Sequence, residues 1–156
     1  MEKYELLLDE AANYGLNVIE KDFRSGAKGL IKGNKIGIRK ELTLVEKGCT
    51  LAEEVAHYLT SVGSILDQSN INNRKQELRA RQWAYQCMIP MDQIIEAHKA
   101  RISGRYALAE YLGVTEKFLQ AAIDRYTSKY GIFLKVDERF TIRFDPLGVI
   151  EYFPTH

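Results

Sequence analysis

Residues 51–62 carry the pattern that most restricts the fold of this chain, because they predict a helix with two chemically different sides. At 100° per residue, the apolar side chains gather on one arc, which contains Leu51, Ala52, Val55, Ala56, Tyr58, Leu59 and Val62. The opposite arc carries Glu53, Glu54 and His57. Glu53 and His57 are four residues apart, so their side chains can converge on one point. We therefore expect a helix that buries one side and presents two carboxylates and an imidazole on the other.

This polar arc has two interpretations from the helix alone. It is either the solvated face of an ordinary amphipathic helix or a set of donors for a divalent metal. A second predicted helix, at about 74–88, carries Glu77 on the same arc as its apolar residues Ala80, Trp83, Ala84, Cys87 and Met88. A carboxylate directed at a core must be paired, protonated or coordinated. The alternatives to a metal are an ion pair with Arg74, Arg79 or Arg81, or a place at the exposed end of the arc.

The rest of the chain predicts an α+β fold. Hydrophobic periodicity and turn residues indicate helices at 2–14, 43–62, 74–88, 91–100, 106–112 and 115–130. The same signals indicate strands at 17–21, 29–32, 35–39, 132–136, 140–144 and 149–153. Gly33 and Asn34 form a two-residue hairpin signal between two of these strands. The order of a helix, a small sheet, several helices and another small sheet is typical of the α+β class.

Composition excludes several classes of protein. The 156 residues include 22 Lys and Arg against 21 Asp and Glu, so the formal net charge is +1, which argues against a strongly basic nucleic-acid binder. No run of about 18 apolar residues is present, so we expect no membrane span. The first residues are charged and lack the apolar core of a secretion signal. Cys49 and Cys87 form no CxxC motif. We therefore expect reduced thiols in a cytoplasmic protein.

Two segments resemble a known family. Residues 50–58, TLAEEVAHY, are similar to the HExxH active helix of zinc metallopeptidases. Residues 77–90, with Glu77, Ala80, Ala84 and the final Met-Ile-Pro, resemble a downstream segment of the ImmA/IrrE family of metallo-endopeptidases. Residues 63–68 and 73–81 are similar to the phage and mobile-element branch. The resemblance implies a zincin-like core over 1–100, in which a small antiparallel sheet packs on the active-site helix. A helix-turn-helix-like region and a short C-terminal β-hairpin follow over 101–156.

The resemblance also implies a role for each site residue. His57 is implied to be a zinc ligand, Glu77 the ligand from the second helix, and Glu54 the general base. Glu53 stands where the family has its first histidine, and it can ligate through oxygen. This EExxH site is more anionic and admits Mn²⁺ or Mg²⁺ more readily, or it binds no metal, or Asp67 compensates for the lost histidine. The implied substrate is a repressor or regulator of the same mobile element, bound along the strand at 35–39.

Two other functions remain open. A catalytically silent relative would act as a protein-binding antirepressor. A DNA-binding regulator would use residues 106–130, where two predicted helices meet at Gly113 and Val114, with Thr115 as N-cap. Acidic residues lie among the basic ones in that segment, at Glu110, Glu116 and Asp124. This mixture favours the packing of a helical hairpin and makes nucleic acid an unexpected partner.

Overall fold

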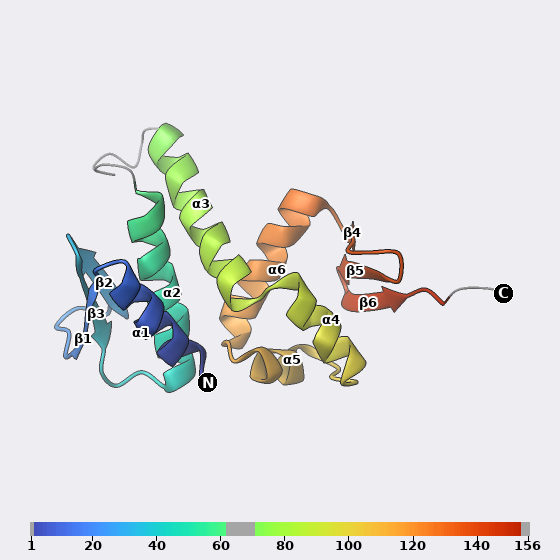
Figure 1. The fold of residues 1–156 in the computed structure, drawn as a ribbon, viewed down its shortest axis with the longest axis horizontal. Coiled ribbons are helices and arrows are strands. Elements are labelled where there is room, and N and C mark those ends of the chain that lie inside the picture. The colour runs from blue at the N-terminus through green and yellow to red at the C-terminus, as the bar shows by residue number, and fades with distance from the viewer. Residues whose placement is uncertain (1, 62–70, 154–156) are drawn as a thin grey trace. The chain divides into compact units, whose positions relative to one another are not determined.

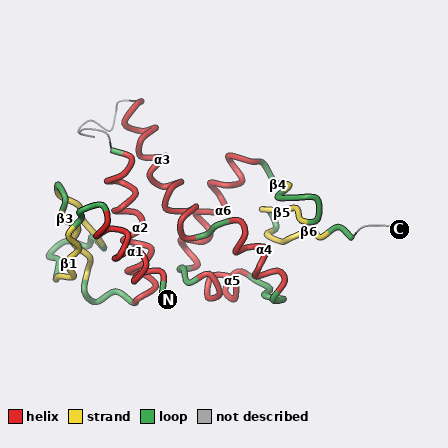
Figure 2. Tube along the Cα trace, in the orientation of Figure 1, coloured by secondary structure: helices red, strands yellow, loops and turns green. Residues whose placement is uncertain are grey.

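The computed structural model describes residues 2–61 and 71–153. The chain separates into two compact units, Met1–Met88 and Ile89–His156. Each unit combines helices with one small sheet (Figure 2), which confirms the predicted α+β class. A compact unit need not fold independently as a domain, so the domain boundary expected after residue 100 stays a prediction. In the described part of the chain, no helix is both long and apolar enough to cross a membrane.

The first unit contains three helices and three strands within its described residues (Figure 1). They are α1 (Lys3–Asn13), β1 (Asn17–Lys21), β2 (Gly29–Lys32), β3 (Lys35–Arg39), α2 (Leu44–Thr60) and α3 (Ile71–Met88). The strand order is β1-β3-β2, in which β3 pairs parallel with β1 and antiparallel with β2. The sheet is therefore mixed, where an antiparallel one was expected. Gly33, at φ 60°, and Asn34 make the predicted tight turn between β2 and β3.

Helix α2 begins with a capping box. The Thr43 side chain accepts a hydrogen bond from the Glu46 backbone N–H, and the Glu46 carboxylate accepts one from the Thr43 backbone. This reciprocal pair satisfies two backbone donors of the first turn and fixes where the helix starts. The buried side of α2 contacts α1, α3, β2 and β3. Tyr58, which the sequence places on the apolar arc, is exposed at the surface.

The sheet and helices of this unit are held by an apolar layer and a polar tie. Ile36 and Ile38 of β3 are fully buried. The polar tie is at Glu20 of β1. The Tyr4 hydroxyl of α1 donates to its carboxylate at 3.0 Å, and the Lys47 ammonium of α2 donates to it at 2.6 Å. The Lys47 ammonium and the Tyr4 hydroxyl both lower the pKa of Glu20. One carboxylate thus links α1, β1 and α2, and fixes the position of the helix that carries the polar arc.

The second unit contains three helices and a three-stranded antiparallel sheet within its described residues. They are α4 (Met91–Lys99), α5 (Arg105–Leu112), α6 (Glu116–Tyr130), β4 (Phe133–Lys135), β5 (Phe140–Phe144) and β6 (Leu147–Glu151). The predicted cap is confirmed, because the Thr115 side chain accepts a hydrogen bond from the Phe118 backbone N–H. Tyr126 and Phe144 are among the largest fully buried side chains. Strand β4 lies within the strand predicted at 132–136 and pairs with β5, which forms the C-terminal hairpin with β6.

Candidate metal centre

His57 of α2 and Glu77 of α3 approach each other across the contact between the two helices. Nδ1 of His57 lies 3.3 Å from Oε2 of Glu77. The other oxygen of Glu77 lies 3.6 Å from Nε of Arg81, one turn further along α3. Both His57 and Glu77 are about three-quarters buried. The structure therefore brings together two of the predicted ligands, and it also forms the Arg81 ion pair that the sequence offered as the alternative to a metal.

Glu54 lies beside this pair. Its side chain is partly buried, and loss of hydration raises its pKa, with the Glu53 and Glu77 carboxylates adding to the rise and His57 opposing it. Glu53 is exposed, yet its pKa is also raised, because neighbouring groups remove water from the charged form. Three carboxylates and one imidazole thus share a small region in which negative charge is poorly hydrated.

The residues present fit a divalent cation in part. Ligands at about 2.0–2.1 Å from a tetrahedral zinc ion lie about 3.3 Å from one another, which is the separation of the two His57 and Glu77 atoms. A cation would also relieve the repulsion among the three carboxylates. Among the described residues, no group of three or more His, Cys, Asp or Glu side chains is arranged to hold a metal ion. Asp67, the possible compensating ligand, lies outside the described residues.

Gly29 of β2 makes room for the Glu54 side chain. A Cβ atom at residue 29 would lie 2.6 Å from Cγ2 of Thr50, 3.3 Å from Cγ of Glu54 and 3.4 Å from Oε1 of Glu54. The first distance is too short for any side chain. The sequence analysis did not single out this residue, although a glycine in a strand is a recognised signal of close approach. The absent side chain lets the edge strand lie directly against the polar face of α2.

Gly29→Ala is expected to destabilise the first unit by about 1–3 kcal/mol, because the new methyl group overlaps the buried Thr50 methyl group. Thr50→Ser removes that methyl group and keeps the hydroxyl. The double variant should therefore regain most of the loss, with a favourable coupling energy in a urea-unfolding double-mutant cycle. Additive effects of the two changes would show that Gly29 does not approach Thr50.

The structure corrects two further expectations. Strand β3, expected to bind extended substrate, is the central strand, so β1 and β2 already occupy both of its edges. Within the described residues, the sheet edge without a paired strand that lies nearest Glu54 belongs to β2. Cys87, which the sequence places on the apolar arc of α3, is exposed, whereas Cys49 is buried, and neither cysteine forms a disulfide.

Comparison with known proteins gives a family match. The sequence matches the peptidase M78 family, described as the IrrE N-terminal-like domain, over residues 11–124. No curated protein and no solved structure matches the chain significantly. The matched region spans more than two thirds of the chain and includes α2, α3 and their polar side chains.

Proposed function

Since the chain belongs to the IrrE N-terminal-like family of peptidases, we propose that it is a metal-dependent endopeptidase whose centre lies between α2 and α3. The observation that carries the proposal is the 3.3 Å approach of His57 and Glu77 beside the partly buried Glu54. His57, Glu77 and Glu53 are the proposed ligands of Zn²⁺ or another divalent ion, and Glu54 is the proposed general base. For Glu53, the support is its position four residues before His57. The raised pKa of its carboxyl, caused mainly by loss of hydration and raised further by the nearby Glu77 carboxylate, also supports this role.

The proposed division of labour follows from the chemistry of each residue. A divalent metal, when bound, supplies Lewis acidity for the scissile carbonyl and lowers the pKa of water. Glu54 takes the proton from the attacking water, and its raised pKa suits it to hold that proton and pass it to the leaving amine. His57 of α2 and Glu77 of α3 would hold the metal ion between the two helices, since their side chains approach each other there. Arg81 orients Glu77 through its second oxygen.

The free edge of β2 is the proposed binding site for an extended substrate. Backbone groups at a free sheet edge can pair with an added strand. Gly29 lies on this strand next to Glu54, so a peptide added there would run beside the base. The proposed substrate is a repressor or regulator of a mobile element, which is supported by the similarity of residues 73–81 to the phage branch of the family.

Metal binding is expected to stabilise the first unit. The protein, purified without chelators, should contain one divalent ion per chain, and its melting temperature should fall by several degrees in EDTA. At 100 times its dissociation constant, a ligand bound only to the native state adds roughly 2.7 kcal/mol. Elemental analysis measures the metal content, and thermal melts with and without EDTA measure the change in melting temperature. His57→Ala serves as the control, because its melt should not respond to EDTA.

The alternative function is that of a catalytically silent relative that binds a regulator without cleaving it. The exposed Glu53 in place of a histidine is the observation that favours it. Absence of metal in the purified protein, with identical melts in EDTA and in added Zn²⁺, would make this alternative the better one.

A further inference from the structure

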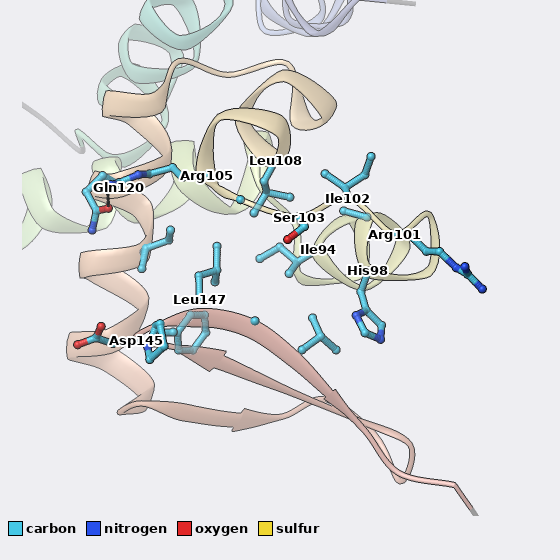
Figure 3. A pocket seen from close by; sticks show the side chains of 17 residues that line it. Ile94, His98, Arg101, Ile102, Ser103, Arg105, Leu108, Gln120, Asp145 and Leu147 are labelled. Atoms are coloured by element: carbon cyan, nitrogen blue, oxygen red, sulfur yellow. Dashed lines mark hydrogen bonds between the residues drawn. The ribbon is translucent and has the colours of Figure 1, made fainter.

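The second unit contains a cavity that the proposed peptidase function does not use. Its volume is about 620 Å³, and it is lined by α4, the start of α5, α6 and the turn between β5 and β6 (Figure 3). Small-molecule sites in proteins occupy roughly 300–1,000 Å³. The cavity is therefore large enough for a small organic ligand, and it is formed entirely within one unit.

The walls of the cavity are mostly apolar. They include Ile94, Leu108, Ile123, Phe144, Leu147 and Val149. Ile94, Leu108, Ile123 and Phe144 belong to the buried core of the unit, so these walls are fixed by packing. Apolar walls of this kind are typical of sites that contact the hydrocarbon body of a ligand.

One end of the cavity carries a positive charge without a carboxylate partner. Figure 3 shows Arg105 beside Gln120 at this end, and the Arg105 guanidinium donates a hydrogen bond to the Gln120 amide oxygen. Within the described residues, no carboxylate pairs with Arg105. Ser103 and Gly104 also line the cavity, and no side chain caps the first turn of α5, which starts there. This end therefore offers several hydrogen-bond donors to an anion.

The other charged groups of the lining do not compete for that anion. Asp145, the acidic residue of the lining, turns its carboxylate away from the cavity in Figure 3. His98 is paired with Glu151, at 3.1 Å between Nε2 and Oε1. Arg101 lies at the opposite end and also points away from the cavity. Arg105 is thus the cation of the lining that lies beside the start of α5, at the rim of the cavity, where Glu116 and Asp124 line a neighbouring hollow.

We propose that this cavity binds a small organic acid, with the apolar body of the ligand against Leu108 and Leu147 and its carboxylate on Arg105. The planar guanidinium fork matches the two oxygens of a carboxylate. The Gln120 amide nitrogen donates to Asp124 at 2.8 Å and its oxygen accepts from Arg105, so Gln120 holds the guanidinium in place and Arg105 is the group assigned to the ligand. The site is independent of the metal centre, since all of its residues belong to the second unit.

Octanoate is the probe for this site, with octan-1-ol as the neutral control of equal chain length. Isothermal titration calorimetry of the full chain should show one octanoate per chain, bound at least tenfold more tightly than octan-1-ol. Butanoate should also bind at least tenfold more weakly than octanoate, because each fully buried methylene strengthens binding by about fourfold. Equal affinities for octanoate and octan-1-ol, or no octanoate binding at millimolar concentration, would overturn the proposal.

Two arginine variants separate the charged end from a general charge effect. Arg105→Gln should weaken octanoate binding at least tenfold, whereas Arg101→Gln, at the opposite end, should change it by less than twofold. Both side chains are exposed, so neither change should alter folding. In the unmodified protein, NMR shifts on adding octanoate should centre on residues 103–105 and 147–149. Shifts centred on α2 and α3, or equal losses in the two variants, would overturn the assignment. Glu54→Gln should bind octanoate as the unmodified protein does, whatever the outcome for peptide cleavage.

Discussion

Glu54→Gln is expected to lower kcat/KM for peptide cleavage by a factor of about 10²–10⁴, while the protein stays folded and keeps its metal. Glutamine has nearly the same shape as glutamate, but its amide cannot take a proton from water at neutral pH. Glu54 is the carboxylate that Gly29 allows to lie beside the edge of β2. The measurement uses the best-cleaved member of a peptide library, identified by mass spectrometry with the unmodified protein.

Metal content distinguishes the base from the ligands. Glu54→Gln should retain the ion, whereas His57→Ala and Glu77→Ala should each lose it, because these two side chains meet at 3.3 Å. If Glu54→Gln also lost the ion, Glu54 would be a ligand. If Glu54→Gln cleaved peptide at the original rate, another group would act as the base, and Glu53 would be the next residue to test.

Sequence was sufficient for the features that depend on local interactions. The apolar periodicity predicted α2 and α6, and the short-range hydrogen bond from Phe118 to Thr115 formed as the cap predicted. The turn at Gly33 and Asn34 formed for the same reason, since its conformation depends on two adjacent residues. These features need no knowledge of what packs against them.

The strand order and the surroundings of Gly29 depend on contacts between distant segments. Pairing of β1 with β3 makes β3 the central strand, and the hydrophobic pattern of β3 does not tell a central strand from an edge strand that is covered on one face. A Cβ atom at residue 29 would lie 2.6 Å from the Thr50 methyl carbon, so this close approach is between β2 and a residue of α2 that lies 21 residues later in the chain. A glycine in the sequence signals such an approach without naming the neighbour.

The site shows the same limit at the level of single side chains. Spacing places Glu53 and His57 on one side of α2, and this arrangement is necessary if both side chains are to bind one metal ion. Which of them meets α3 depends on how the two helices pack. In the structure His57 contacts Glu77, while Glu53 is exposed. The family match includes both residues, so the role of Glu53 as a ligand stays a prediction.

Leu51→Ala is expected to destabilise the first unit by about 3–5 kcal/mol, because Leu51 of α2 is fully buried in the core of this unit. The loss combines the transfer free energy of the deleted atoms with the cavity they leave. Trp83 of α3 is the single tryptophan of the chain, so its fluorescence in a urea titration reports the unfolding of this unit. The midpoint should fall while the slope with urea concentration stays constant.

Leu44→Ala is the matched control, because it makes the same change on the same helix at a side chain that is 53% exposed. Its effect should stay within about 0.5 kcal/mol. The difference between the two variants then measures mainly burial, since both changes delete the same side-chain atoms. Similar small losses in both variants would mean that Leu51 does not lie in a core. The polar arc would then lose its fixed orientation toward α3, and the approach of His57 to Glu77 would have no packed helix to hold it.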